Sequence, residues 1–404
     1  MRRVGVVAAV VAAALIVTAQ GPATAAPSGD KEKQFIVTLR KASGVQALTS
    51  ARPVAEQYGG TVLRTYTKVL NGFALRATAA EAGRLAADPR VERVEPDVRV
   101  SGAAVRPYPV WNLDRIDQRS SVLDDAYAYP DEAGAGVKTY IMDTGIRTSH
   151  TEFGGRASIG FDAINDGWNG QDCGDLGHGT LVAGIAGGAT YGMAPATSLV
   201  AVRVLGCDNF GSISQIIAGV EWVTQNAPRP AVVNMSLGGV ATIPALDDAV
   251  AASIAAGITY VIAAGNSELD TCTTSPGRVP GAITVAASNP NGERATGWGG
   301  TQPGSNFGPC VDLFAPGEQV KSSYNASDRA TRVQRGTSLA APHVAGAAAL
   351  ILSKYPDATP AEVSTMIVNS ATVGAINPAT LRGSPDRLLY ISDVIDPPVR
   401  PAVP

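Results

Sequence analysis

A series of short, almost continuously apolar stretches is the feature that most constrains the fold of this chain. Five of them are "VKTYIMDTG" (137–145), "TSLVAVRVL" (197–205), "AVVNMSLGG" (231–239), "ITYVIAAGN" (258–266) and "GAITVAAS" (281–288). Helical patterns alternate with them and follow His178, Ser212, Pro244 and Ser338. Parallel strands covered by helices on both faces are apolar throughout. The sequence therefore predicts an α/β domain with a doubly wound, mainly parallel sheet, whose active site lies beyond the carboxyl ends of the strands.

The preceding segment predicts a separate small unit. Residues 33–40 alternate like a strand, 45–59 has helical spacing, 60–78 reads as two strands around a turn, 79–89 is helical, and 91–100 ends in a strand. This βαββαβ order is typical of a ferredoxin-like α+β unit. The segment contains no histidine or cysteine, so we expect it to serve folding or binding rather than catalysis. Residues 101–109 contain small residues and prolines, which indicates a loop at the domain boundary.

The N-terminus has the pattern of an export signal. Arg2 and Arg3 precede the apolar run 4–17, and Ala23–Ala25 offers a small-x-small cleavage site. The alternative, a membrane anchor, needs about 20 apolar residues, which this run does not reach. We therefore expect a secreted protein that has no membrane association once the signal is removed. The net charge of −3 argues against a nucleic-acid partner.

All four cysteines follow the export signal. An oxidising compartment predicts two disulfides among Cys173, Cys207, Cys272 and Cys310, and three pairings are possible. Their spacing is not of the CxxC kind, so a zinc site is not expected.

Ser338 lies in a pattern that suits a nucleophile. "GTSLAAPHVAG" (336–346) reads as a glycine turn that opens a helix, and we expect Pro342 in the first helical turn. The Ser338 hydroxyl then lies at the positive end of the helix dipole. His343 follows five residues later, about 140° around the helix, so it points away from Ser338 and is expected to be structural.

Two histidines remain as candidate bases. His150 lies in a polar loop, whereas His178 follows a glycine turn in "GHGTLVAG" (177–184). Asp143 ends a buried strand, where a carboxylate can orient an imidazole. These residue types favour His178 paired with Asp143.

Three motifs together carry a family resemblance. "IMDTGI" (141–146), "GHGTLVAG" and "GTSLAAPHVAG" resemble the active-site motifs of the subtilisin-like serine peptidases, in the same Asp, His, Ser order. The similarity extends over about residues 111–392 and looks closest to the proteinase K and aqualysin branch, as in "WNLDRIDQR", "IRTSHTEFGGR", "RPAVVNMSLGG" and "PCVDLFAPG". The stretch 34–100 resembles the inhibitor-type propeptide of the same family.

The resemblance implies roles for individual residues. Ser338 is the implied nucleophile, His178 the general base and then acid, Asp143 its orienting group, and Asn266 in "VIAAGNS" the side-chain oxyanion donor. The implied substrate edge is Ser236, Leu237, Gly238 and Gly239, and the implied opposite wall of the S1 pocket is Ala263, Ala264 and Gly265. Such walls favour apolar and aromatic side chains in the substrate. Leu181 and Leu339 depart from the family pattern, which usually has histidine and methionine there.

Calcium and the disulfide pairing are also implied by the resemblance. Oxygen ligands of the kind that calcium prefers come from Asp114, Asp117, Gln118 and Asp124, with a solvated acidic turn as the alternative. A second implied site is Asp312, completed by backbone carbonyls near Pro280 and Ala282. The implied disulfides are Cys173–Cys207 and Cys272–Cys310, and no catalytic cofactor is implied.

We therefore expect a monomeric, secreted serine endopeptidase that acts on proteins and peptides and is made as a self-processed precursor. The expected parts are a signal peptide (1–25), a propeptide that acts as intramolecular inhibitor (26–102, cut near Gly102) and a peptidase domain (103–404, with a short tail from about 394). A serine esterase would place its nucleophile in G-x-S-x-G, whereas Ser338 lies in "GTSLA". A non-catalytic binding protein on the same fold would lack a triad member or Asn266, and all four are present.

Overall fold

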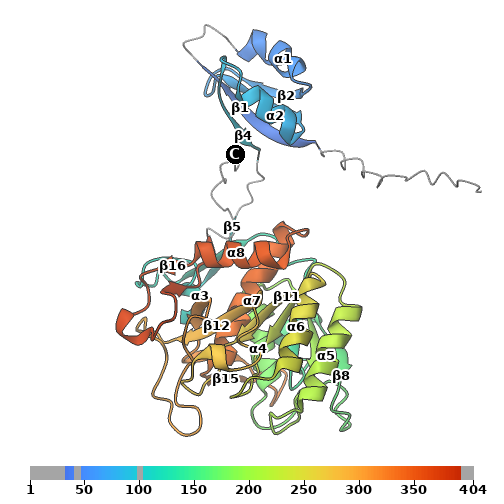
Figure 1. Ribbon diagram of the computed structural model, residues 1–404, viewed down its shortest axis with the longest axis vertical. Coiled ribbons are helices and arrows are strands. Elements are labelled where there is room, and N and C mark those ends of the chain that lie inside the picture. The colour runs from blue at the N-terminus through green and yellow to red at the C-terminus, as the bar shows by residue number, and fades with distance from the viewer. Residues whose placement is uncertain (1–31, 41–46, 98–102, 393–404) are drawn as a thin grey trace, which may run out of the picture. The chain divides into compact units, whose positions relative to one another are not determined.

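The chain divides into two compact units, with the division between residues 100 and 101 (Figure 1). The computed structural model describes residues 32–40, 47–97 and 103–392. The predicted export signal, the predicted cut near Gly102 and the tail from about 394 lie outside the described residues. Within those ranges, no helix has the length and apolar character to cross a membrane.

The first unit has the predicted βαββαβ order. Its elements are β1 (Lys33–Leu39), α1 (Ala47–Gln57), β2 (Thr61–Tyr66), β3 (Gly72–Ala77), α2 (Ala79–Ala86) and β4 (Val91–Pro96). The four strands form a sheet in the order β2-β3-β1-β4, with β1 antiparallel to both neighbours. Val37 and Leu39 of β1 pack with Val54 of α1 and Leu85 of α2, so alternate strand residues face the helices.

The second unit is built around a large, mainly parallel sheet. Its strands are β7 (Lys138–Asp143), β8 (Ala157–Asp162), β9 (Ser198–Arg203), β10 (Ala231–Met235), β11 (Thr259–Ala263), β12 (Ile283–Ser288), β13 (Leu313–Pro316), β16 (Thr372–Val373) and β17 (Arg387–Leu388). They lie in the order β16-β17-β13-β12-β11-β10-β7-β9-β8. Every neighbouring pair is parallel except β16 and β17. The five predicted strands form consecutive parts of this sheet.

Helices cover both faces of this sheet, as the apolar strands require. They are α3 (Trp111–Asp114), α4 (His178–Gly187), α5 (Ile213–Asn226), α6 (Pro244–Ala255), α7 (Thr337–Lys354) and α8 (Pro360–Ser370). On one face, Val233 and Met235 of β10 belong to the core beneath α5 and α6, which lie side by side in Figure 1. On the other face, Val232 of β10 and Val261 of β11 belong to the core beneath α7 and α8. The predicted doubly wound α/β fold is confirmed.

The segment expected to be a loop at the domain boundary is partly a strand. Residues Ala103–Pro107 form β5, which pairs antiparallel with β6 (Ala126–Pro130). Arg106 explains how a short strand rich in small residues is held. Its guanidinium donates to the carbonyls of Thr190 and Gly192 and stacks on the Tyr127 and Tyr129 rings.

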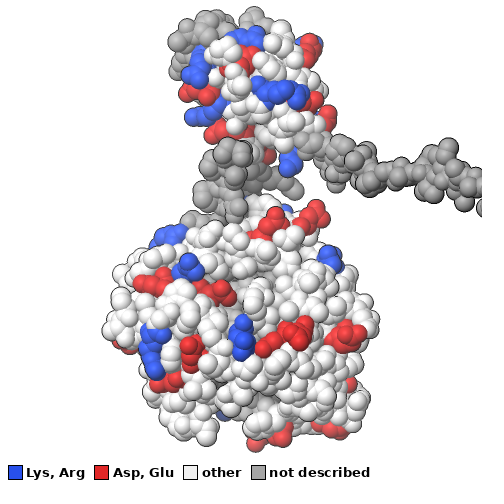
Figure 2. Space-filling view, viewed as in Figure 1, with Lys and Arg blue, Asp and Glu red and all other residues white. Residues whose placement is uncertain are grey.

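The remaining described strands, β14 (Val320–Ser323) and β15 (Thr331–Gln334), form a hairpin. Short 3₁₀ turns occupy Thr151–Phe153, Thr271–Thr273 and Pro378–Thr380. On the face that Figure 2 shows, acidic and basic side chains are interspersed within each unit, and no basic stripe is visible.

Candidate active site

The carboxyl ends of three central strands meet at one edge of the large sheet. Met142 of β7 is in register with Met235 of β10, and Met235 with Ile262 of β11. Asp143, Ser236 and the loop that begins after Ala263 therefore leave the sheet at neighbouring positions. This is the edge at which a doubly wound sheet is expected to place its site.

Asp143 and His178 form a direct pair at this edge. The Nδ1 atom of His178 lies 2.8 Å and 2.9 Å from the two carboxylate oxygens of Asp143, which is fully buried. Burial alone would lower the pKa of His178, but the charge and hydrogen bond of Asp143, together with the charge of Asp172, raise it above the ordinary value. The pair holds the imidazole through Nδ1, and Nε2 has no hydrogen-bond partner in the described parts of the chain, so it can take part in a proton transfer.

Glycines allow α4 to begin so close to β7. His178 is the first residue of α4, and Gly177 before it has a left-handed φ of 54°. A Cβ added to Gly179 would lie 2.1 Å from the carbonyl oxygen of Gly145. Only a residue without a side chain permits this approach, which brings His178 to Asp143.

Ser338 lies in the first turn of α7, beside the start of α4. Leu181 follows His178 by three residues and Leu339 follows Ser338 directly, and both belong to one apolar cluster with Ile185 and Val320. This cluster joins the first turns of the two helices. Within the described residues, no hydrogen bond links Nε2 of His178 to Oγ of Ser338. Such bonds are often long before substrate binds.

Asn266 faces Ser338 in a fixed orientation. Its Oδ1 accepts hydrogen bonds from the backbone N–H of Thr337 (2.8 Å) and from the Thr337 hydroxyl (2.9 Å). A Cβ added to Gly336, whose φ is +140°, would lie 3.0 Å from Ser338 Oγ and 3.5 Å from Asn266 Nδ2. The amide donor of Asn266 and the Ser338 hydroxyl therefore face a common space that glycine keeps open.

Pro342 is not in the first turn of α7, contrary to the expectation from sequence. The helix begins at Thr337, so Pro342 lies one turn further on, where an ordinary residue would donate its N–H to the carbonyl of Ser338. The hydroxyl of Ser236 replaces that donor, at 2.8 Å from the carbonyl oxygen. Asn234 donates in turn to Ser236 Oγ at 2.8 Å.

The other two histidines are held elsewhere. His343 is fully buried, with Nδ1 2.8 Å from the carbonyl oxygen of Leu339 and Nε2 2.8 Å from Nδ2 of Asn112. Burial lowers its pKa to about 4, so it stays neutral. His150 Nε2 lies 2.9 Å from the carbonyl oxygen of Ala330. Both are hydrogen-bonded away from the Asp143 and His178 pair.

Two backbone segments flank this arrangement. Residues 236–239 leave β10, with Ser236 buried and Gly238 exposed. Ala263 and Ala264 are buried at the end of β11, and Gly265 donates its N–H to the Thr337 hydroxyl at 3.1 Å. The side chains of the second segment are small and uncharged.

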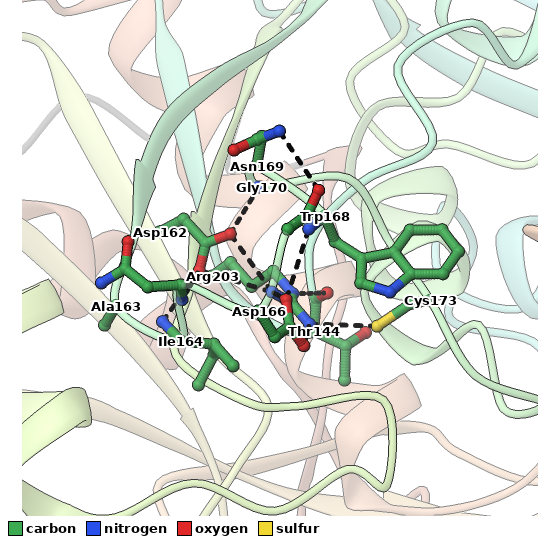
Figure 3. Close-up of polar contacts among 12 residues, drawn as sticks. Thr144, Asp162, Ala163, Ile164, Asp166, Trp168, Asn169, Gly170, Cys173 and Arg203 are labelled. Carbon is green, nitrogen blue, oxygen red and sulfur yellow. Dashed lines mark hydrogen bonds and ion pairs between the residues drawn. The ribbon is translucent and has the colours of Figure 1, made fainter.

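The loop that leads from β8 to α4 is fixed by a buried arginine (Figure 3). Arg203 donates to both carboxylate oxygens of Asp166, at 2.6 Å and 2.8 Å, and to Asp162. It also donates to the carbonyl of Thr144 and contacts the sulfur of Cys173 at 3.1 Å. The loop therefore has a cation of its own at its centre.

The two disulfides of the structure pair the cysteines as the resemblance implies. Cys173 is bonded to Cys207, and Cys272 to Cys310. Among the described residues, the one group of three acidic, cysteine or histidine side chains with ligand atoms within 4.8 Å is Asp166, Cys173 and Cys207. Its sulfurs are in a disulfide and its carboxylate binds Arg203, so it is no metal centre.

The first implied calcium site fits a cation in part. One carboxylate oxygen of Asp117 is buried without a hydrogen-bond partner among the described residues, and the other accepts from the N–H of Ala128. Burial, with the charges of Asp124 and Asp114, raises the pKa of Asp117 to about 7. A cation would give the unpartnered oxygen of Asp117 a ligand contact and would stabilise the charged form of its carboxylate. However, Asp114 already accepts from the N–H groups of Asp124 and Asp125, and the three carboxylates are not gathered within 4.8 Å.

Gln118 and Asp312 complete the account of the implied metal ligands. The amide of Gln118 donates to the carbonyl of Val122, which leaves its oxygen for another partner. Asp312 precedes β13 and accepts from the N–H of Thr284, two residues beyond Ala282. Burial raises its pKa. Asp312 thus lies beside the chain segment of the implied carbonyl ligands at Pro280 and Ala282.

Several residues of this site were not predicted from the sequence. Thr337 orients Asn266, and Ser236 and Asn234 act through side chains rather than backbone. Asp172 accepts three hydrogen bonds from Thr144 and Thr180. The proline at 342 was a usable signal, because its missing N–H leaves a carbonyl that needs another donor.

Comparisons with known proteins agree with this geometry. Residues 134–387 match the profile described as the subtilase family, and residues 25–102 match peptidase inhibitor I9. An extracellular serine proteinase of Thermus sp. (strain Rt41A) is 49% identical over 332 residues, or 82% of this chain and 78% of the relative. A cuticle-degrading serine protease of Arthrobotrys oligospora is 35% identical over 389 residues, or 91% and 92%. The crystal structure of a cold adapted subtilisin-like serine proteinase matches with a TM-score of 0.65 and 43% identity, over 70% of this chain and 98% of that chain.

Proposed function

Since this chain belongs to the subtilase family and is a serine endopeptidase, we propose that it is secreted and cleaves proteins after apolar and aromatic residues with broad specificity. The observation that carries the proposal is the pair of His178 and Asp143 beside the first turn of α7, where Ser338 lies. The name of the Thermus relative, the export-signal pattern and the two disulfides support secretion.

The proposed reaction uses this chain's own groups. His178 Nε2 takes the hydroxyl proton of Ser338 as Oγ attacks the peptide carbonyl carbon, and Asp143 stabilises the resulting imidazolium. The developing oxyanion receives hydrogen bonds from Nδ2 of Asn266 and from the backbone N–H of Ser338, which is free in a first helical turn. The imidazolium then protonates the leaving amine. Water, activated by the same histidine, hydrolyses the acyl-enzyme.

Small residues support the proposed preference for apolar side chains. We place the substrate backbone along residues 236–239, opposite Ala263, Ala264 and Gly265. Neither of these two segments carries a charged side chain. A pocket with such walls gives an aspartate or lysine side chain no partner, so burying either one costs free energy. Peptides that differ only in the residue before the cleaved bond test this. We expect higher kcat/KM with Phe or Leu than with Asp or Lys, and equal values would contradict it.

The N-terminal part supports a proposal about maturation. We assign residues 1–25 to the signal, 26–102 to an intramolecular inhibitor and folding aid, and 103–404 to the peptidase, which works as a monomer. The precursor cuts itself near Gly102. Residues 26–102 added in trans at micromolar concentration should inhibit the mature enzyme, and the absence of inhibition would contradict this role.

Calcium is proposed as a structural ligand. Asp117, whose buried oxygen lacks a partner among the described residues, would hold it together with Asp114, Gln118 and Asp124. Asp312, with carbonyls near Pro280 and Ala282, would form a second site. When bound, the ion would supply positive charge to these buried carboxylates and cross-link their loops. No catalytic step uses it.

The main test is the Ser338→Ala variant of the full chain. We expect casein cleavage to be lost and the precursor to remain unprocessed, because no other group attacks the carbonyl. Ser353→Ala, a serine in the same helix that donates to the carbonyl of Leu350, is the matched control and should process normally. A serine-directed inhibitor should block the wild type. Normal processing by purified Ser338→Ala would refute self-cleavage.

A further inference from the structure

A second buried carboxylate lies beside the pair of His178 and Asp143. Asp172 is only 5% exposed, and it lies in the loop between β8 and α4, directly before Cys173, whose sulfur Arg203 contacts. One of its oxygens accepts from the Thr144 hydroxyl at 2.7 Å. The other accepts from the backbone N–H of Thr180 at 2.9 Å and from the Thr180 hydroxyl at 2.5 Å.

The donors around Asp172 are arranged for a negative charge. The Thr144 hydroxyl already accepts the N–H of Gly179, and the Thr180 hydroxyl accepts the N–H of Arg147. Each hydroxyl therefore has its proton left for the carboxylate. With a backbone N–H as the third donor, Asp172 accepts in every hydrogen bond it makes. Burial raises the pKa of Asp172 above its ordinary value, and these three hydrogen bonds oppose that effect by stabilising the ionised form.

These contacts connect Asp172 to both members of the pair. Thr144 follows Asp143 and donates its backbone N–H to the Asp143 carboxylate at 2.7 Å. Thr180 lies in the first turn of α4, which His178 opens. Asp172 thus ties the turn after β7 to the first turn of α4.

The charge of Asp172 also acts on His178. Its carboxylate and that of Asp143 both raise the pKa of the imidazole against the opposing effect of burial. A negative charge at the N-terminal turn of α4 is favoured by the helix dipole. The charged residues whose backbone or side chain makes hydrogen bonds in or beside this turn are Asp143, Arg147, Asp172, Asp175, Arg203 and Arg332. Arg147 and Arg203 are paired with other aspartates.

We propose that Asp172 is a positioning residue of the peptidase reaction, which fixes the first turn of α4 against Asp143 and supplies a second negative charge for the imidazolium of His178. The inference rests on the proposed role of His178 as general base. It assigns a catalytic purpose to a side chain that does not touch Ser338, Asn266 or the substrate edge in the described structure.

The direct test is Asp172→Asn in the full chain, which removes the charge and keeps the shape. The amide oxygen can still accept from Thr180, so the fold of α4 is maintained. We expect kcat to fall by about 10-fold with little change in KM, and the acid limb of the pH profile to move to lower pH. Loss of the negative charge makes the imidazolium less stable, which accounts for both effects.

Asp175→Asn is the matched control. It removes the same charge three residues before His178, but its side chain is exposed and screened by solvent. Its kcat and pH profile should equal those of the wild type. Titration with a serine-directed inhibitor gives the concentration of folded sites for each variant, so kcat is compared per active molecule.

A second pair of variants tests the same proposal if Asp172→Asn does not fold. Thr144→Val removes the hydroxyl that joins Asp172 to the turn after Asp143, and Thr144→Ser keeps it. We expect kcat to fall in the valine variant and to recover in the serine variant. In addition, the chain has three histidines, so the imidazole of His178 can be titrated by nuclear magnetic resonance in the Ser338→Ala background.

The outcomes separate this inference from the function on which it rests. Unchanged kcat and acid limb in folded Asp172→Asn, or wild-type kcat in Thr144→Val, would overturn the positioning role while the peptidase assignment stands. If Ser338→Ala keeps activity, or wild-type activity has no acid limb, the proposed triad is wrong and the inference falls with it. The positioning role of Asp172 is supported if the acid limb moves in Asp172→Asn and stays in place in Asp175→Asn.

Discussion

The hydroxyl of Ser236 donates a hydrogen bond to the carbonyl oxygen of Ser338, 2.8 Å away. Pro342 makes this contact necessary, because it removes the N–H that would otherwise bind that carbonyl within α7. The residue that begins the proposed substrate edge thus also holds the turn that carries the proposed nucleophile. A displacement of either segment changes the position of the other.

We predict that Ser236→Ala lowers the free energy of unfolding by about 1–3 kcal/mol, the cost of an unsatisfied buried acceptor. Its kcat should fall as the first turn of α7 loosens. Denaturant unfolding and steady-state kinetics measure the two effects.

A double-mutant cycle checks the cause of that loss. Pro342→Ala restores an N–H that can bind the Ser338 carbonyl, so it should recover more stability in the Ser236→Ala background than in the wild type. We expect a coupling of about 0.5–3 kcal/mol. The Ser236→Ala change also leaves the Asn234 amide without its acceptor. Strict additivity would show that this amide, rather than the carbonyl, accounts for the loss.

We predict that Asn266→Ala lowers kcat by about 10²–10³-fold, the effect known for the corresponding donor in subtilisin, with little change in KM. Thr337 fixes the Asn266 amide through its hydroxyl, so Thr337→Val should show a smaller loss of the same kind. Thr337→Ser keeps the hydroxyl and serves as the control. An increase in KM with unchanged kcat would mean that Asn266 binds substrate instead of the oxyanion.

We predict that the stabilisation by calcium grows as pH rises through about 7. Asp117 has a pKa of about 7, so below that pH a proton competes with the ion for the carboxylate. In the absence of calcium, folding favours the protonated form of Asp117. Its contribution to the free energy of unfolding therefore falls as pH rises from the unfolded pKa, about 4, to about 7. The difference in thermal midpoint between calcium and chelator should be larger at pH 8 than at pH 5.

Asp117→Asn is the control for the calcium prediction. The asparagine side chain cannot titrate, so this variant should lose the part of the difference in thermal midpoint that comes from the Asp117 site, together with its dependence on pH. The difference that remains belongs to the second proposed site, at Asp312. Calcium that is in 100-fold excess over its Kd would stabilise the wild type by about 2.7 kcal/mol. If the wild type melts at the same temperature with and without chelator, calcium has no structural role at this site.

We predict that activity resists peroxide because of Leu339. The side chain is buried in the cluster with Leu181, Ile185 and Val320, directly after Ser338. Methionine at this position would oxidise to a polar sulfoxide inside an apolar cluster next to the nucleophile. Leu339→Met should therefore lose peptide hydrolysis faster than the wild type in peroxide. Equal rates of loss would place the sensitive group elsewhere, for example at Met142 or Met235.

The strands and the residues at their ends could be predicted because a strand that is buried on both faces is apolar at almost every residue. Asp143 was located this way, whereas Ser236 was named through the family resemblance. The hydrogen-bond networks could not be predicted, because Asp172 contacts Thr144 across 28 residues and Ser236 contacts Ser338 across 102. Such partners depend on how the helices lie on the sheet. The strand at Ala103–Pro107 was missed because Arg106 and the β6 partner stabilise it, rather than its own β-propensity.

The bridge from Cys173 to Cys207 has a consequence for a protease that meets copies of itself in solution. The 34-residue interval that it closes contains His178 and the exposed side chain of Leu176, which suits the proposed apolar preference. A nick at any bond within this interval opens the chain but releases no fragment, because both new ends stay tethered to the same sulfur bridge. The cut molecule gains one water and loses no residue, so His178 stays covalently joined to the rest of the enzyme after self-digestion at this place.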